Sequence, residues 1–284
     1  MLHRFNIENS KPTKTPSCPF IRLVPHDEVT LFDPTQYRSM VGALQYLTFT
    51  RPNIAFSVHQ LCQFMSHLTT THLKVAKCVL RYIRGTLNFG ISFTPGLLTL
   101  TTFLDSDWAG DPTDRRSTTS LVIFLGPNSI SWSAKKQSNI SRSSTKVEYH
   151  TLATTVVELA WLRTLFKELH IYLSRIPVIW CDNISAIALS TNLVFHSRNK
   201  YLKVDYHFTC EKVLQKQLQI GFISGRDNFA DIFTKSLSAP LFCFLHSKLL
   251  VDSSPISLRG DVEHRSVAVK KKTTKKERIH EEES

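Results

Sequence analysis

The sequence predicts an α/β fold in which helices flank a mixed five-stranded sheet. Residues 97–104, 117–126 and 129–136 form three strand-like segments joined by short polar turns, a pattern that indicates an antiparallel meander. Residues 144–169 then have apolar side chains at helical spacing, and the continuous apolar run at 177–181 is typical of a central parallel strand. Antiparallel strands followed by a long helix and a parallel strand predict the mixed sheet.

A smaller all-helical segment precedes the sheet. Residues 1–36 contain several prolines and little periodicity, so we expect extended or loop structure there. From 37 to 95 the pattern is mainly helical, with Pro34 and Pro52 placed to begin helices and Gly85 placed to end one. Because this segment has basic residues but no acidic cluster, we expect it to position a substrate and not to carry chemistry. The basic residues are Arg38, Arg51, Lys74, Lys77, Arg81 and Arg84.

Further elements follow the parallel strand. We expect helices at 183–190 and 202–216, a fifth strand at 218–224 and a short final helix at 230–237. The chain is therefore predicted to comprise a loop segment (1–36), a helical segment (37–95), an α/β domain (96–250) and a basic, disordered tail (251–284). In sheets of this type the ligand crevice lies beyond the carboxyl ends of the parallel strands.

Size and composition indicate a globular protein with a polyanionic partner. The chain has 284 residues, 42% hydrophobic content and a formal net charge of +12. This charge favours nucleic acid as a partner, although simple solubility explains it equally well. No apolar stretch approaches a membrane span, and the first residues lack the apolar core of a signal peptide. We therefore expect an intracellular protein of the nucleus or cytoplasm without a membrane partner.

The six cysteines are scattered without CxxC pairs, which favours reduced thiols over a disulfide scaffold. His59, Cys62, His67 and His72 have the ligand spacing of a zinc knuckle. However, apolar residues recur there at helical intervals, and no glycine permits the tight turns of a knuckle. We therefore expect an ordinary helix.

Four acidic residues lie where a soluble fold favours apolar or neutral side chains. Asp105 ends the apolar run of the first strand, and Asp182 ends the parallel strand. Glu148 is four residues before Leu152 and shares the buried stripe of the long helix, while Asp231 lies at the start of the final helix. A carboxylate in apolar surroundings loses solvation and needs a cation for compensation.

Each carboxylate also has an ordinary structural explanation. An aspartate after a strand is often a turn former or a helix N-cap, and Glu148 suits the dipole of a helix N-terminus. Asp105 and Asp182, however, end strands that we expect to be neighbours, and the helices that carry the other two acids cover the sheet. We therefore expect the four to converge on two divalent cations. Oxygen ligands without His or Cys fit Mg²⁺, with Mn²⁺ as the alternative.

The motifs around these acids resemble a known family. LDSDWAG, DRRST, SRSSTKVEY, WCDNISAI and FADIFTK are similar to the ribonuclease H domain of Ty1/copia-type retrotransposon polyproteins, and residues 33–56 resemble the segment that joins reverse transcriptase to that domain. The resemblance runs from about Leu2 to Val262. It implies a ribonuclease H-like fold and an Mg²⁺-dependent endonuclease that hydrolyses the RNA strand of RNA–DNA hybrids.

The resemblance implies catalytic and metal-binding roles for Asp105, Glu148, Asp182 and Asp231. Asp107 is the competing candidate for the first of these positions. The order Asp, Glu, Asp, Asp is that of ribonuclease H, whereas related transposases and integrases have the glutamate last. An RNA–DNA hybrid is therefore the expected partner.

Several positions depart from the family. The chain has no Asp–Asp pair, so the polymerase active site is absent and the missing reverse transcriptase portion is a second expected partner. Lys146, Tyr201 and Cys210 stand where the family usually has an acid, His and Arg, respectively. Residues 224–231 also lack the His expected to help product release. The alternative function is therefore a catalytically silent, hybrid-binding remnant that keeps the fold.

Six residues are candidates for contacts with the hybrid: Lys135, Lys136, Arg142, Ser143, Ser144 and Asn183. The three basic residues precede the catalytic helix, where phosphate contacts are useful, although a solvated strand end explains them equally well. The three polar residues are suited to sugar 2′-hydroxyls. The basic run at 270–278 is a nuclear-localisation or nucleic-acid patch, or simply part of a disordered tail.

Overall fold

A computed structural model of the chain describes residues 1–18, 23–24, 30, 33–66, 68–191, 202–249 and 251–253. His67, Tyr201 and the basic run at 270–278 lie outside these described residues. The helical elements are η1 (His3–Phe5), α1 (Thr35–Leu47), η2 (Pro52–Ile54), α2 (Ala55–Cys62), α3 (Thr70–Gly85), α4 (Ser144–Glu168), α5 (Ile184–Thr191), α6 (Leu202–Leu214), η3 (Gly225–Asp227), η4 (Phe229–Phe233) and α7 (Ala239–Lys248). The strands are β1 (Phe89–Ile91), β2 (Leu100–Ser106), β3 (Thr118–Leu125), β4 (Asn128–Lys136), β5 (Val178–Cys181), β6 (Gln219–Phe222) and β7 (Val251–Ser253).

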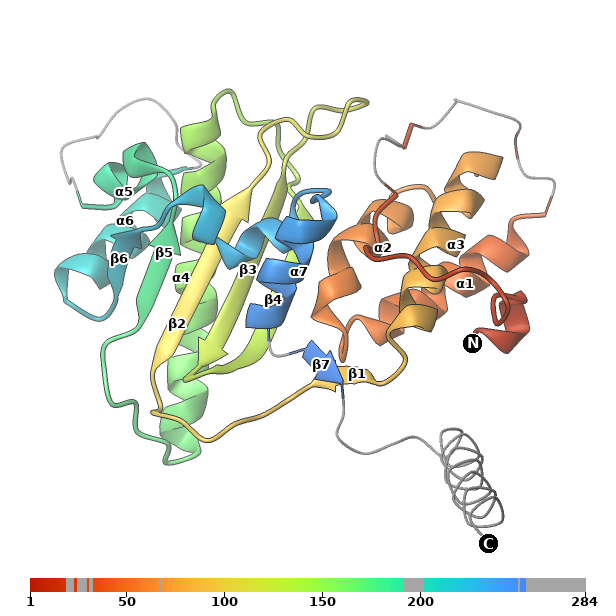
Figure 1. Cartoon of the computed structure of the whole chain (residues 1–284). Coiled ribbons are helices and arrows are strands. Elements are labelled where there is room, and N and C mark those ends of the chain that lie inside the picture. The colour runs from red at the N-terminus through yellow and green to blue at the C-terminus, as the bar shows by residue number, and fades with distance from the viewer. Residues whose placement is uncertain are drawn as a thin grey trace, which may run out of the picture.

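The main sheet has five strands in the order β4-β3-β2-β5-β6 (Figure 1). β2, β3 and β4 form the predicted antiparallel meander, and β5 pairs in parallel with both β2 and β6. The polar residues that end β2 and β5 therefore lie at the same edge of the sheet. The structure confirms the predicted fold class, a mixed five-stranded sheet with flanking helices.

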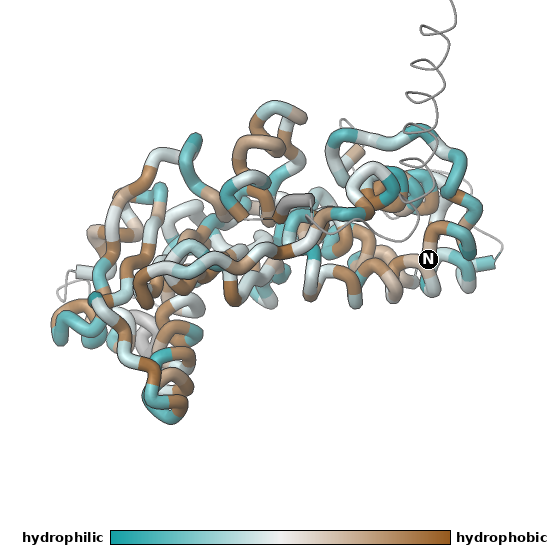
Figure 2. Tube along the Cα trace, turned by 60° about the horizontal axis from the view of Figure 1, so that its bottom comes forward, coloured by the Kyte–Doolittle hydropathy of each residue, from teal (hydrophilic) through white to brown (hydrophobic). Residues whose placement is uncertain are grey.

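One face of the sheet is covered by α4, α5 and α6. Their buried side chains form a hydrophobic cluster with the side chains of β2, β3 and β5 that point to this face. α4 begins where Ser143 caps it by accepting a hydrogen bond from the Lys146 amide, and its inward stripe includes Leu152, Val156 and Leu159. The helices alternate between hydrophobic and hydrophilic residues along the chain, as expected of amphipathic helices (Figure 2).

The opposite face is covered by η4, α7 and the helical segment α1–α3. These elements and the sheet share a second hydrophobic cluster, to which the sheet contributes Phe103, Val122 and Phe124. In addition, the Trp132 indole of β4 donates a hydrogen bond to the Thr48 carbonyl at 3.0 Å. In Figure 1, α7 lies between the sheet and the helical segment. Because both parts contribute to one core, the division at residue 95 stays a prediction.

The helical segment is held by buried polar contacts as well as apolar packing. Thr69 and His72 form a reciprocal capping box at the start of α3. Arg51 is only 4% exposed and donates hydrogen bonds to the Thr86 carbonyl at 2.9 Å and the Thr86 hydroxyl at 2.7 Å. Its guanidinium therefore fixes the end of α3 and is not free for a substrate. The predicted helix around His59 is also present, as α2.

The C-terminal part of the chain differs from the prediction in three ways. The expected final helix at 230–237 is the shorter 3₁₀ helix η4, and α7 follows it without having been predicted. The first residues of the predicted tail form β7, which pairs with β1 in a two-stranded sheet. In the N-terminal segment, predicted as extended or loop structure, residues 1–18 have one short 3₁₀ helix, η1, and otherwise irregular backbone, and Phe5 and Ile7 pack into the core.

The prediction of reduced cysteines is also wrong for one pair. Cys18 and Cys78 form a disulfide across a sequence separation of 60 residues. This bond attaches the N-terminal segment to α3. Cys62, Cys181, Cys210 and Cys243 do not take part in a disulfide. None of the helices in the described part of the chain combines the length and apolarity that a membrane span requires.

Candidate active site

Two of the predicted carboxylates lie on neighbouring parallel strands. Asp105 is the second-last residue of β2 and is 2% exposed, while Asp182 directly follows β5 and is partly buried. Thr234 donates a hydrogen bond to Asp105 Oδ2 from the turn after η4. Since β2 and β5 run in parallel, both carboxylates lie at the crevice beyond the strand ends.

Glu148 reaches this crevice from the first turns of α4. Its side chain is 5% exposed, and Oε1 accepts hydrogen bonds from the Ser106 amide at 3.1 Å and the Ser106 hydroxyl at 2.8 Å. These two bonds attach the carboxylate to the end of β2. The other oxygen, Oε2, is buried and has no hydrogen-bond partner.

Asp231 is the fourth predicted carboxylate, and it lies next to Lys235, a residue that sequence reasoning missed. It lies in η4 and is 7% exposed. Lys235 Nζ lies 2.7 Å from Asp231 Oδ1 and 3.2 Å from Asp105 Oδ2. Lys235 therefore links two of the four carboxylates. The signal was present in the sequence, because Asp231 and Lys235 have the i, i+4 spacing of a helical ion pair.

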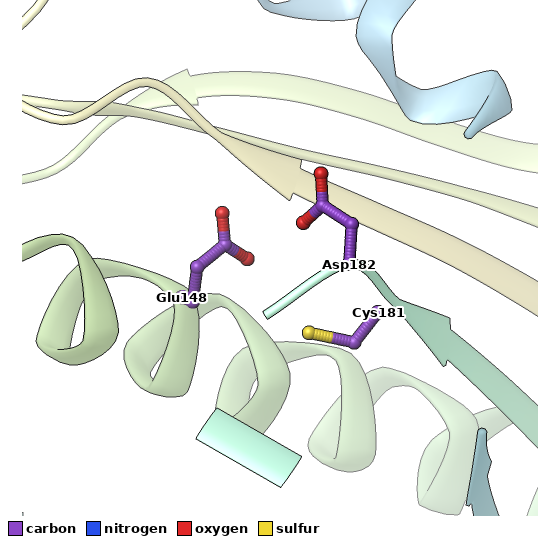
Figure 3. Close-up of side chains that lie close together, drawn as sticks. All are labelled: Glu148, Cys181 and Asp182. Carbon is purple, nitrogen blue, oxygen red and sulfur yellow. The ribbon is translucent and has the colours of Figure 1, made fainter. Parts of the chain in front are cut away.

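The four carboxylates form two groups that share Asp182. Ligand oxygens of Asp105, Asp182 and Asp231 lie within 4.8 Å of one another. Ligand atoms of Glu148, Cys181 and Asp182 meet the same limit. Figure 3 shows the carboxylate of Glu148, on α4, next to that of Asp182, at the end of β5. The structure therefore brings all four predicted acids together and adds Cys181 to them.

Burial and mutual repulsion hold protons on these carboxylates. Burial is the largest cause, and it raises the pKa of Glu148 to about 8 and that of Asp231 to about 7. The pKa of Asp182 is also raised, again mainly by burial. In all three cases the charge of Asp105 is the second cause.

The pKa of Lys235 is also raised, which for an amine favours the charged form. Burial lowers the pKa of Lys235, but the charge of Asp105 and the hydrogen bond to Asp231 outweigh burial and raise it above its usual value. The ammonium group therefore stays charged at neutral pH. Its side chain is 42% exposed, so solvent screens part of its attraction to the carboxylates.

Asp107, the competing candidate for the first position, lies apart from both groups. Its Oδ1 accepts a hydrogen bond from the Thr118 amide. Its side chain lines a cavity of about 400 Å³ between this loop and α2. Burial raises the pKa of Asp107 to about 6. Asp107 therefore has a local structural partner and lies outside the cluster that contains Asp105.

The chemistry of the cluster fits divalent cations. Four carboxylates face a single ammonium group, so full ionisation leaves three uncompensated negative charges. Glu148 Oε2 is a buried acceptor without a donor, and such an atom is normally satisfied by a hydrogen bond or an ion. Carboxylate oxygens are also the ligands that Mg²⁺ and Mn²⁺ prefer.

Of the six predicted hybrid-binding residues, three have side-chain contacts within the protein: Lys136, Ser143 and Asn183. Lys136 Nζ forms ion pairs with Asp111 at 2.5 Å and with Asp114 at 2.9 Å, which hold the turn between β2 and β3. The Asn183 side chain accepts a hydrogen bond from the Ala186 amide and caps α5, just as Ser143 caps α4. The remaining three are exposed: Lys135 near the end of β4, Arg142 just before α4 and Ser144 as its first residue.

The strand order and the placement of the helices define a ribonuclease H-like fold, with an acidic cluster at the carboxyl ends of β2 and β5. Comparison with known proteins gives the family. The chain is 45% identical over 258 residues to the retrovirus-related Pol polyprotein from transposon RE1 of Arabidopsis thaliana. The matched region covers 90% of this chain and 18% of that protein. The chain is 43% identical over 261 residues to the corresponding RE2 polyprotein, which covers 92% and 18%. The chain belongs to the family of retrovirus-related Pol polyproteins of copia-type transposons.

The chain spans about 18% of the length of these relatives. No protein-family model matches it. Among solved structures, it is similar to LC11-RNase H1 at a TM-score of 0.36 and 13% identity, which covers 48% of this chain and 94% of that chain. The fold class rests on the strand order and not on this score, because the value is below 0.5.

Proposed function

We propose that this protein is a metal-dependent endonuclease that hydrolyses the RNA strand of RNA–DNA hybrids. One observation carries the proposal: Asp105, Glu148, Asp182 and Asp231 come from four separate elements and meet at the carboxyl ends of two parallel strands. Three buried carboxylates and a partly buried one destabilise a fold unless they have a function or a cation, because each loses solvation. A site for divalent cations explains this arrangement.

Two Mg²⁺ ions, with Mn²⁺ as a substitute, are the cofactor that fits. Asp105, Asp182 and Asp231 would hold one ion, and Glu148 together with Asp182 would hold the other. When bound, such ions stabilise the negative charge that develops on the phosphate during hydrolysis.

The chain's own groups prepare the site. Ser106 orients Glu148 by donating two hydrogen bonds to Oε1, which leaves Oε2 directed to the crevice. Thr234 holds Asp105 through Oδ2. Lys235 keeps its proton on Nζ and limits the repulsion between Asp105 and Asp231 in the metal-free protein. The carboxylates are therefore placed before a cation arrives, which reduces reorganisation.

The exposed surface at the start of α4 is the proposed contact with the hybrid. Lys135 and Arg142 are exposed and suited to backbone phosphates. Ser143, Ser144 and Asn183 flank the acidic cluster and are proposed to contact sugar 2′-hydroxyls, the group that distinguishes RNA from DNA. Lys136 supports this surface through its ion pairs with the β2–β3 turn. The reverse transcriptase portion is the proposed second partner, because the relatives are much longer than this chain.

A labelled hybrid tests the proposed function. Purified protein is incubated with an RNA–DNA hybrid in which each strand has its own label, with Mg²⁺ or with EDTA. We expect cleavage of the RNA strand alone, and its complete loss in EDTA. Hybrid binding without cleavage in Mg²⁺ or Mn²⁺ would support the alternative, a catalytically silent remnant. Cleavage that persists in EDTA would rule out a metal-dependent enzyme.

A further inference from the structure

The acidic cluster contains a thiol that the proposed reaction does not use. Cys181 is fully buried at the end of β5, and its Sγ atom lies within 4.8 Å of ligand oxygens of Glu148 and Asp182. Figure 3 shows the three side chains together, on α4 and at the end of β5. The group Asp105, Asp182 and Asp231 contains carboxylates alone and shares only Asp182 with this mixed triad.

We propose that Glu148, Cys181 and Asp182 form a site for thiophilic divalent cations such as Zn²⁺ or Cd²⁺. A thiophilic cation in this mixed triad would take the place of the Mg²⁺ that Glu148 and Asp182 would hold, and so would inhibit the nuclease. The binding of the cation stands on the geometry alone, whereas the inhibition rests on the proposed function.

An unsatisfied buried atom indicates that the mixed triad is open to a ligand. Glu148 is 5% exposed, Ser106 holds its Oε1, and its Oε2 has no hydrogen-bond partner. The Glu148 carboxylate is directed toward Asp182 (Figure 3). Lys235 forms ion pairs with Asp105 and Asp231, so its charge compensates the carboxylate group and not the mixed triad. A cation in the mixed triad would supply Oε2 with the partner that it lacks.

The donor set selects among cations. A thiolate favours Zn²⁺ and Cd²⁺, whereas Mg²⁺ prefers oxygen ligands alone. Zinc binds sulfur at about 2.3 Å and oxygen at about 2.1 Å, so tetrahedral ligands lie roughly 3.6 Å apart. Ligand atoms that already lie within 4.8 Å need only small side-chain rotations to reach this geometry. Three protein ligands also leave the fourth position to water, as in open zinc sites.

The sulfur of Cys181 has two backbone contacts with Asn183. As a thiol it donates a hydrogen bond to the Asn183 carbonyl at 3.8 Å, and burial raises its pKa to about 12, so a cation has to displace the proton. The Asn183 amide donates a hydrogen bond to Cys181 Sγ at 3.4 Å. Such a bond stabilises a thiolate and orients it, which is the usual role of groups next to metal ligands. Binding replaces the thiol proton by the cation: the S–H bond breaks, a metal–sulfur bond forms, and the proton leaves to the solvent.

Titration with Cd²⁺ tests the site, because a cadmium–thiolate bond has an ultraviolet charge-transfer band. The full chain is titrated without nucleic acid and without reductant, which keeps the Cys18–Cys78 disulfide closed. We expect a charge-transfer band that saturates at one Cd²⁺ per chain. The Cys181→Ser variant should lose the band and bind Cd²⁺ at least about tenfold more weakly, since even the loss of a neighbour of a ligand has effects of this size.

Two further variants make the result decisive. Glu148→Gln keeps the thiol and the shape of the side chain, and it should also weaken Cd²⁺ binding at least about tenfold. Cys243→Ser removes an exposed thiol and should change neither the band nor the affinity. A band that survives in Cys181→Ser, a band that disappears in Cys243→Ser, or an unchanged affinity in Glu148→Gln would overturn the site. If Cys181→Ser does not fold, Glu148→Gln and Cys243→Ser still decide.

The inhibitory effect is measured separately on hybrid cleavage in excess Mg²⁺. Zn²⁺ added in slight excess over protein should suppress cleavage by the parent, and a chelator selective for Zn²⁺ should restore it. Undiminished cleavage with the mixed triad occupied would overturn the inhibition. Absence of cleavage under every condition, together with the expected cadmium band, would instead overturn the proposed nuclease and leave the cation site intact.

Discussion

Replacing Glu148 with Gln should stabilise the metal-free protein at neutral pH. The pKa of Glu148 is raised from an ordinary 4.5 to about 8, mainly by burial. The folded state therefore binds this proton more tightly than the unfolded state does. The resulting contribution to stability is full below pH 4.5 and is lost as the pH rises through 8. Gln resembles the protonated carboxyl group and can still accept the two hydrogen bonds from Ser106.

The size of the effect follows from the pKa shift. Between pH 4.5 and pH 7 the unfolded carboxyl group ionises freely, while the folded one mostly keeps its proton. At about 1.4 kcal/mol for each pKa unit, the carboxylate destabilises the fold by at most about 3 kcal/mol at pH 7 and by less than about 1 kcal/mol at pH 5. For a chain of this size, a gain of 2–3 kcal/mol corresponds to roughly 5 °C or more in Tm.

Thermal melts in EDTA at pH 5, 6, 7 and 8 measure this effect. The difference in Tm between Glu148→Gln and the parent should grow with pH. Glu168→Gln is the matched control, because Glu168 is exposed on the same helix, and it should leave Tm nearly unchanged at every pH. A variant that melts below the parent at pH 7 and pH 8 would refute the reasoning, since Glu148 would then be a stabilising acceptor and not a strained carboxylate.

Three other perturbations have defined outcomes. Lys235→Gln should lower the stability of the metal-free protein by about 1 kcal/mol, a small value because the ammonium group is partly exposed. Since Lys235 and a bound cation would compensate the same carboxylates, the variant should also enlarge the rise in Tm caused by Mg²⁺. Melts with and without Mg²⁺ measure both effects, and an unchanged Mg²⁺ response would contradict this competition. Arg51→Met should destabilise the fold by about 2–3 kcal/mol, because Thr86 loses buried donors, and it should leave the salt dependence of hybrid binding unchanged. Chemical denaturation measures the stability and binding titrations measure the salt dependence; a reduced salt slope would indicate a phosphate contact. The double variant Lys135→Ala, Arg142→Ala should reduce the slope of log affinity against log salt by roughly 1–2, and an unchanged slope would remove both residues from the interface.

Much of the fold could be predicted because its signals are local. The apolar runs within 117–126 and 177–181 and the stripe of 144–169 depend on neighbouring residues alone, and each corresponds to an element of the structure. The meeting of Asp105 and Asp182 could be predicted for the same reason, since the parallel pairing of β2 and β5 places their ends together. Hydrophobic periodicity and the parallel direction of the two strands were sufficient to predict the sheet, α4 and the meeting of these two carboxylates.

The remaining features depend on tertiary contacts or on weak signals. The Cys18–Cys78 disulfide joins residues 60 positions apart, and no spacing rule selects this pair. β1 and β7 have only three residues each, too few for a periodic pattern. α7 did have a signal, with Pro240 at its start, but its short apolar sequence concealed the helix.

The surroundings of individual polar residues, such as Arg51 and Cys181, also depend on tertiary contacts. Burial of Arg51 in the core and the approach of Cys181 to Glu148 depend on how whole elements pack. Sequence reasoning treated Arg51 as a basic residue available to a substrate, whereas its hydrogen bonds to Thr86 give it a structural position. Lys235 is different, because its spacing from Asp231 was visible in the sequence and was overlooked.

The central claim, that the converging carboxylates form the catalytic site, is tested most directly by hybrid cleavage with Asp182→Asn. Asp182 belongs to both groups of ligands, and Asn removes its charge while keeping its shape. We predict that cleavage of the RNA strand in Mg²⁺ falls at least about a thousandfold, which corresponds to about 4 kcal/mol of transition-state stabilisation. The matched variant Asp107→Asn should keep most of the activity, because Asp107 lies outside both groups. Retained cleavage by Asp182→Asn, or a larger loss in Asp107→Asn, would contradict the account.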